Sequence, residues 1–314
     1  MSPPGAGAAE PERRRRSGPR RRSTARADLA RTPGFAAVSP EVGVLDREAF
    51  DAALARDPDA ALTLLVEMTR ATDERLRAQA RELARRVVLD VDHRHRPRRP
   101  GVHRLRPVRA EQGGELDVDA SVGAVVDARA AGRAPEPRDL VARDWARPDL
   151  ALCLLIDSSG SMTGRRLAAA ALAAGACTWR APRDHAVLSF ARTTTVLRDL
   201  HSQRPAAEVV DAILGLQAHG TTALATALRG AADQLGRSRA ARRVAVLLSD
   251  CRSTDGEDPV PIAAAVPELV VIAPGGDSDE AEALARATGA RWTGLDGPAD
   301  IAAAFARVLD DQSA

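Results

Sequence analysis

Residues 150–161 read LALCLLIDSSGS, and this stretch decides the fold of the chain. A run of apolar residues ends abruptly at Asp157 and continues as a short polar loop. A strand that is apolar without alternation is typical of a parallel sheet with helices covering both of its faces. The stretch therefore predicts a buried central strand whose carboxyl end carries Asp157.

The same pattern of strands and helices continues through the C-terminal half. Buried strands are predicted at RRVAVLLSD (242–250) and PELVVIAP (267–274), an edge hairpin at HAVLSFA (185–191) and TTVLRDL (194–200), and a short last strand at ARWTG (290–294). Helices are expected near residues 164–180, 205–215, 222–236, 278–288 and 298–310. Strands that alternate with helices predict an α/β fold with a mostly parallel sheet and helices on both faces.

The N-terminal half predicts four further segments before this domain, which we expect to span residues 149–314. Residues 1–40 hold a block of arginines among Pro, Gly, Ser and Ala, and they are expected to form a disordered basic arm. Residues 41–92 have apolar residues at helical spacing and predict a small helical region. Residues 93–112 read as a basic, proline-punctuated linker, and residues 113–148 as a strand–helix lead-in.

Composition excludes several classes of enzyme. The 314 residues include no lysine, so a phosphate-binding P-loop lysine, a Schiff-base lysine and a lysine general base are all absent. The chain also has neither a GxxxxGK[ST] motif nor a GxSxG elbow. A hydrolase with Asp157 as its nucleophile is the remaining catalytic alternative, but the loop has no second Asp two residues on. We expect a binding protein and not an enzyme.

Cysteine usage and hydropathy suggest the compartment. The three cysteines are odd in number and form no CxxC pair, which fits a reduced environment. No apolar run is long enough for a membrane span, and no hydrophobic segment follows the N-terminal arginines. The expectation is a cytoplasmic protein without a membrane association.

Oxygen-bearing side chains gather at the predicted strand ends. Asp157, Ser159 and Ser161 alternate after the first strand, Asp250 follows the strand at 242–248, and Thr222 lies in a loop that opens a helix. Ligands of open α/β sheets bind at the carboxyl ends of the strands, so these groups are expected to converge. Hydroxyls with few carboxylates are hard ligands that suit Mg²⁺, with Mn²⁺ as the alternative, better than Zn²⁺.

At these residues the chain resembles von Willebrand factor type A (VWA) domains with a metal-ion-dependent adhesion site (MIDAS). The resemblance covers roughly residues 149–310 and rests on D-x-S-x-S, a later Thr and a later Asp. It implies that the metal ligands are Asp157, Ser159, Ser161, Thr222 and Asp250. It also implies that the serines and the threonine ligate directly, that the aspartates act through water, and that one open position takes a carboxylate from a partner.

Two further residues stand near the expected site. Thr221 precedes Thr222, and spacing to the following Ala227-Leu228 favours Thr222 as the ligand without excluding its neighbour. Cys251 stands where the family often has glycine, and His219-Gly220 stands where it often has Gly-Gly. A small apolar role for Cys251 is favoured over a reactive thiol, since no histidine accompanies it.

The order of segments is similar to the intracellular bacterial branch of this family, namely CoxE-type proteins and the VWA-bearing D subunit of magnesium chelatase. That resemblance implies a MoxR-type AAA+ ATPase as partner, and a client protein that offers Asp or Glu to the metal. A magnesium-chelatase-like metal-insertion subunit is the first alternative. The second is a protein that binds nucleic acid or an acidic partner through the basic arm and linker, although arginine runs are more often solvated tails.

Overall fold

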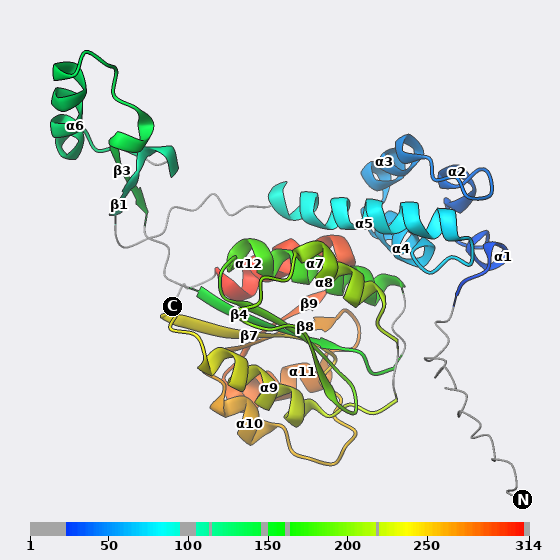
Figure 1. Ribbon diagram of the computed structural model, residues 1–314. Helices are drawn as coiled ribbons and strands as arrows, with labels where there is room; N and C mark the ends of the chain where they lie inside the picture. Colours follow the sequence, from blue (N-terminus) through cyan, green and yellow to red (C-terminus); the bar gives the residue numbers. More distant parts are fainter. Residues whose placement is uncertain are drawn as a thin grey trace, which may run out of the picture.

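The computed structural model describes residues 23–94, 105–112, 115–145, 150–160, 164–217 and 220–310. Its main feature is a six-stranded sheet with the order β6-β5-β4-β7-β8-β9 (Figure 1). The strands are β4 (Leu150–Asp157), β5 (His185–Phe190), β6 (Thr194–Arg198), β7 (Arg242–Leu248), β8 (Leu269–Pro274) and β9 (Arg291–Leu295). All pairs are parallel except β5–β6, so the predicted edge hairpin and the predicted mostly parallel sheet are both confirmed.

Helices cover both faces of the sheet. One face carries α7 (Gly164–Arg180), α8 (Ala206–Leu214) and α12 (Ile301–Leu309), and the other carries α9 (Leu224–Gly236), α10 (Val260–Ala265) and α11 (Asp279–Thr288) (Figure 1). Strand β4 is buried on both faces of the sheet. Leu154 and Ile156 pack into one apolar cluster, while Cys153 and Leu155 pack into the other. This double burial explains why β4 has no polar alternation.

The predicted N-terminal helical region is also present. It contains α3 (Arg47–Arg56), α4 (Pro58–Met68) and α5 (Glu74–Arg94). The Asp57 carboxylate accepts a hydrogen bond of 3.0 Å from the amide of Ala60, and Pro58 occupies the first turn of α4. The Asp57-Pro58 step therefore ends one helix and caps the next. Among the described residues, no helix is both long and apolar enough to cross a membrane.

The prediction of disorder over residues 1–40 is wrong for residues 24–38. Two short helices, α1 (Arg26–Leu29) and α2 (Phe35–Val38), lie there, and Leu29, Phe35 and Val38 are buried in the larger apolar cluster. The Arg26 guanidinium stacks 5.0 Å from the centre of the Phe35 ring, and it donates to the Ser39 carbonyl at 2.7 Å. Three apolar anchors thus outweigh the arginine-rich composition of this stretch. Residues 1–22 lie outside the described residues.

The predicted linker at 93–112 contains regular structure. Helix α5 runs to Arg94, and β1 (Leu105–Arg109) pairs with β3 (Val141–Trp145) in a small antiparallel sheet that includes β2 (Glu115–Leu116). Proline lacks a backbone N–H, and Pro107 is tolerated because β1 is an edge strand. Helix α6 (Val118–Ala130) follows β2. The expected lead-in at 113–148 thus contains β2, α6 and β3, and its strand β3 pairs with β1 of the expected linker.

The helical region packs directly on the sheet domain. Gly164 at the start of α7 faces α4 so closely that a Cβ there would lie 2.9 Å from Cγ of Glu67. Arg85 of α5 makes a two-pronged ion pair with Asp211 of α8, with Nη2 to Oδ2 at 2.6 Å. Residues of both regions belong to one apolar cluster. The helical region is therefore part of the same packed body as the sheet.

A second close contact of a glycine, that of Gly297 with α4, leaves no room for an added methyl group. The Asp59 carboxylate of α4 accepts a hydrogen bond of 2.8 Å from the amide of Ala299 in η3 (Pro298–Asp300), and a Cβ on Gly297 would overlap that carboxylate. We expect Gly297→Ala to displace Asp59 and to lower the free energy of unfolding by about 1–3 kcal/mol in urea denaturation.

The control for Gly297→Ala is the same change in an Asp59→Ala background. There the overlap is gone, so the added methyl group is expected to cost less than half as much. Equal costs in the two backgrounds would show that the overlap with Asp59 is not the cause.

Candidate metal centre

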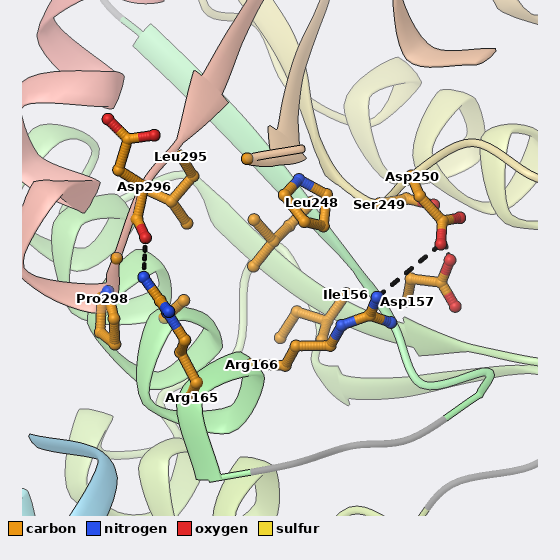
Figure 2. A pocket seen from close by; sticks show the side chains of 14 residues that line it. Ile156, Asp157, Arg165, Arg166, Leu248, Ser249, Asp250, Leu295, Asp296 and Pro298 are labelled. Atoms are coloured by element: carbon orange, nitrogen blue, oxygen red, sulfur yellow. Dashed lines mark hydrogen bonds and ion pairs between the residues drawn. The ribbon is translucent and has the colours of Figure 1, made fainter. Parts of the chain in front are cut away.

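The carboxyl ends of β4 and β7 lie side by side. Ile156 pairs with Leu248 in the parallel register, so Asp157 and Ser249 are the next residues along the two strands. Figure 2 shows Asp157, Ser249 and Asp250 together at this edge. The two runs that predicted the strands are 92 residues apart, and the sheet joins them.

Hydrogen bonds fix both oxygens of the Asp157 carboxylate. Oδ1 accepts from the Ser159 amide at 2.8 Å and from the Ser159 hydroxyl at 2.5 Å. Oδ2 accepts from the Ser249 hydroxyl at 2.6 Å. Bonds to an ionised acceptor are short and strong, so they hold the carboxylate and the two hydroxyls in one cluster.

Asp250 adds a second carboxylate whose side chain is only 16% exposed. Its Oδ1 accepts from the Arg252 amide at 3.1 Å, and its Oδ2 lies 3.9 Å from Nη2 of Arg166. Burial raises the pKa of Asp250, and the neighbouring charge of Asp157 raises it further, while the Arg252 amide and Arg166 lower it. A buried carboxylate beside a second negative charge favours a cation at this position.

The loop with Thr222 is anchored at the same edge of the sheet. The Thr222 amide donates to the Thr254 hydroxyl at 2.8 Å, and the Thr254 amide donates to the Thr222 carbonyl at 3.0 Å. The following Ala223 amide donates to the Ala191 carbonyl at 2.8 Å, just past the end of β5. Thr222 is buried, whereas Thr221 is half-buried. The loop therefore joins the segment after β5 to the segment after β7.

The structure brings four of the five sequence-predicted ligands to one edge of the sheet: Asp157, Ser159, Thr222 and Asp250. The fifth, Ser161, lies outside the described residues. Two participants were not predicted. Ser249 binds Asp157, and Arg166 approaches Asp250 from α7. The Ser-Asp pair at the end of the 242–248 run was a signal for Ser249, whereas Arg166 carried none.

Cys251 packs as an apolar residue. Like the other two cysteines of the chain it is buried, and its side chain belongs to the apolar cluster beneath α9 and α10. Burial raises the pKa of the thiol, and the charge of Asp250 raises it further, which disfavours the nucleophilic thiolate. Its φ of +63° is a left-handed conformation that glycine adopts without strain. This geometry accounts for glycine being common here in the family that the chain resembles.

The chemistry of the donor set fits Mg²⁺ or Mn²⁺. The candidate ligands that the structure describes offer only carboxylate and hydroxyl oxygens, which are hard donors. Within those parts of the chain, no group of three or more His, Cys, Asp or Glu side chains is placed to hold a metal.

Part of the sheet domain matches a known family model. Residues 152–257 match the model of the von Willebrand factor type A domain. A comparison with curated proteins found no match.

Three of the solved structures to which the chain is similar are as follows. A von Willebrand factor type A protein from Catenulispora acidiphila is 21% identical with a TM-score of 0.41, over 53% of this chain and 43% of that one. Proximal thread matrix protein 1 from the mussel byssus, with a zinc-occupied MIDAS motif, is 14% identical (TM-score 0.43, 52% and 48%). Manganese-loaded TRAP protein from Plasmodium vivax is 18% identical (TM-score 0.42, 50% and 72%). The match spans less than half the length of the first two.

Proposed function

We propose that this chain, which carries a von Willebrand factor type A domain, binds a partner protein through a divalent cation held at the ends of β4 and β7. The observation that carries the proposal is the Asp157 carboxylate, fixed by Ser159 and Ser249 beside the second carboxylate of Asp250. Two of the similar proteins hold zinc in a MIDAS motif and manganese, respectively, and the hard oxygen donors here favour Mg²⁺.

The ligands proposed for the cation are Asp157, Ser159, Ser161, Thr222 and Asp250. When bound, the cation supplies an open coordination position for a carboxylate oxygen. The chain's own residues orient that position, because Asp157 holds the hydroxyls of Ser159 and Ser249 in place. Asp157 and Asp250 are half-buried, and the lower dielectric at such a position strengthens the attraction of the cation to a partner's Asp or Glu.

For the partner, we propose a MoxR-type AAA+ ATPase together with a client enzyme complex that it remodels. The support is the resemblance to CoxE-type proteins, including a helical region ahead of the VWA domain. The chain has no P-loop and no lysine, so ATP turnover in such an assembly belongs to the partner. A magnesium-chelatase-like role in metal insertion is the alternative within the same class.

The pathway is tested by recovering partners of the tagged protein from its native lysate with Mg²⁺ and with EDTA. An AAA+ ATPase or its client retained only with Mg²⁺, and lost with Asp157→Ala, is the expected result. Partners that are indifferent to EDTA, or nucleic acid alone, would contradict cation-dependent binding and favour the basic segments.

The two adjacent threonines allow a matched test of the metal centre itself. We expect Thr222→Ala to weaken Mn²⁺ binding about tenfold or more, because a buried hydroxyl is removed from the proposed ligand set. Thr221→Ala removes the same group one residue earlier and is expected to change the affinity less than about twofold. Mn²⁺ titration followed by electron paramagnetic resonance, with Mg²⁺ as competitor, measures both. A larger effect at Thr221 would move the ligand to that residue.

A further inference from the structure

A cavity of about 290 Å³ opens directly beside the candidate metal centre (Figure 2). It lies between the carboxyl ends of β4, β7, β8 and β9 on one side and the first turns of α7 on the other. Its walls are mainly apolar and come from Ile156, Ala169, Leu248, Pro274, Leu295 and Pro298. Asp157 and Asp250 line both the cavity and the metal centre, so the two spaces adjoin.

The walls are held from several sides. The Gly275 amide donates to the Leu295 carbonyl at 2.9 Å, which ties the ends of β8 and β9 together. Arg165 of α7 donates to the Asp296 carbonyl, as Figure 2 shows. Helix α4 braces η3 through the bond between Asp59 and the Ala299 amide at 2.8 Å. The cavity is therefore formed before any ligand arrives, which lowers the entropic cost of filling it.

The size of the cavity suits amino-acid side chains. An apolar cavity of about 150 Å³ is enough to hold benzene, so about twice that volume admits one large or two small side chains. Apolar walls favour an aliphatic or aromatic occupant, because its burial removes apolar surface from water.

Charged side chains at the rim make the attraction of the cavity for an anionic ligand depend on whether the cation is bound. Two arginines and three aspartates line it: Arg165, Arg166, Asp157, Asp250 and Asp296. Their formal sum is −1, and a divalent cation at the metal centre changes it to +1. An anionic ligand is therefore repelled without the cation and attracted with it.

Arg166 lies at the junction between the cavity and the metal centre. Its Nη2 lies 3.9 Å from Oδ2 of Asp250, a distance that makes an ion pair but not a hydrogen bond. Its side chain remains 37% exposed. Its Nη1 lies 4.0 Å from the point where a Cβ on Gly160, in the loop after β4, would stand. A guanidinium carries five N–H donors in a fork that matches a carboxylate.

We propose that the cavity is the specificity pocket of the same binding event. It takes a large apolar side chain, such as leucine, adjacent to the acidic residue of the partner whose carboxylate reaches the cation, and Arg166 donates to the second oxygen of that carboxylate. The partner is thus a polypeptide segment with an acidic residue next to an apolar one. This inference rests on the proposed function, since it requires the cation.

The test uses short blocked peptides on the full chain: Gly-Asp-Leu-Gly, Gly-Leu-Asp-Gly, and versions with Leu replaced by Gly or Asp by Asn. Binding is followed with Mg²⁺ by methyl NMR shifts of Ile156, Leu248 and Leu295, which line the cavity. One of the leucine peptides is expected to bind about tenfold or more tightly than its glycine version, because a leucine side chain is buried. The asparagine peptides are expected not to bind.

Two substitutions test the apolar cavity and the contact of Arg166 with the carboxylate separately. Ala169→Leu adds bulk to the cavity wall and is expected to abolish the preference for leucine while Mn²⁺ still binds. Arg166→Gln is expected to weaken the acidic peptides about fivefold or more, measured at a Mg²⁺ concentration that saturates the variant. Arg239→Gln is the matched control, because Arg239 is exposed just before β7, at the opposite end of that strand from Ser249.

The outcomes distinguish this inference from the proposed function. If Mn²⁺ does not bind, both fail together. If Mn²⁺ and the glycine peptides bind but leucine adds nothing, only the specificity pocket is overturned. If free 4-methylpentanoate binds as tightly as the best leucine peptide, the cavity serves a small carboxylic acid, and the partner segment is overturned.

Discussion

Replacing Asp157 with alanine is expected to lower the affinity of the chain for Mg²⁺ or Mn²⁺ by at least about 100-fold while the domain stays folded. The change removes one of two carboxylates from the proposed site, and it also releases the Ser159 and Ser249 hydroxyls that Asp157 holds. Loss of a group that only orients a ligand typically costs 10–100-fold in metal affinity, so loss of a charged ligand is expected to cost more.

Mn²⁺ titration measures this effect, and circular dichroism with thermal unfolding establishes whether the variant is folded. Asp233→Ala is a matched control, since it removes one carboxylate from the exposed side of α9, away from the strand ends. Wild-type affinity in Asp157→Ala would place the cation elsewhere. Should the alanine variant unfold, Asp157→Asn keeps the shape of the side chain and tests the same charge.

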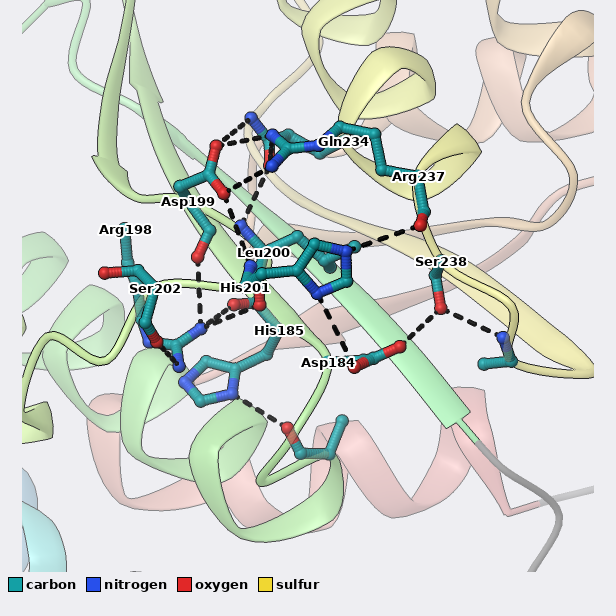
Figure 3. Close-up of polar contacts among 12 residues, drawn as sticks. Asp184, His185, Arg198, Asp199, Leu200, His201, Ser202, Gln234, Arg237 and Ser238 are labelled. Atoms are coloured by element: carbon teal, nitrogen blue, oxygen red, sulfur yellow. Dashed lines mark hydrogen bonds and ion pairs between the residues drawn. The ribbon is translucent and has the colours of Figure 1, made fainter.

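The stability of the sheet domain is expected to fall as pH decreases from about 6.5 to about 4, because of the buried His185. Its Nδ1 donates to the Ala181 carbonyl at 2.8 Å, and its Nε2 lies 3.3 Å from the Thr178 hydroxyl. Burial, with a smaller contribution from the charge of the nearby Arg198 guanidinium, lowers the pKa of His185 to about 4, although the hydrogen bond to the Ala181 carbonyl acts to raise it. Figure 3 shows His185 and Arg198 within a polar cluster at the amino end of β5.

The direction of this pH effect on stability depends on how many protons the folded and the unfolded chain bind. Between pH 4 and 6.5 the unfolded chain takes up a proton on His185 that the folded chain does not, so unfolding becomes easier as pH falls. The shift from an ordinary value near 6.5 corresponds to about 3 kcal/mol, lost in full once pH is below the folded-state value. Above pH 6.5 the residue makes no pH-dependent contribution.

Urea denaturation of the wild type and of His185→Asn at pH 7 and pH 4.5 isolates this contribution. Asparagine keeps a donor near the Ala181 carbonyl but does not titrate. The variant is therefore expected to lose about 2–3 kcal/mol less than the wild type between the two pH values. Parallel pH profiles would show that His185 is not the group responsible. Asp199, whose pKa the Arg237 guanidinium holds at about 2, contributes only at lower pH.

The sequence predicted the sheet domain well because local patterns specify it. The apolar runs at β4, β7 and β8 do not alternate, which indicates strands that are buried on both faces. The segments between them have apolar residues at helical spacing, which predicts the helices that cover those faces. The short α10 was not predicted, since six residues that follow Pro259 and include Pro261 carry too little periodicity. The disorder expected up to residue 40 was wrong at 24–38 because composition does not reveal that Leu29, Phe35 and Val38 find a core.

The order of polar residues at strand ends was likewise set by the sequence alone. Asp157 and Asp250 follow apolar runs, so parallel pairing had to bring them to one edge. Tertiary structure decided what surrounds them. Ser249 binds a carboxylate 92 residues away, and Asp59 braces η3 across 240 residues. The cavity beside the metal centre exists only because four strand ends, α7 and η3 meet there. Such contacts depend on how packed elements approach one another, and no local pattern of residue types encodes that distance.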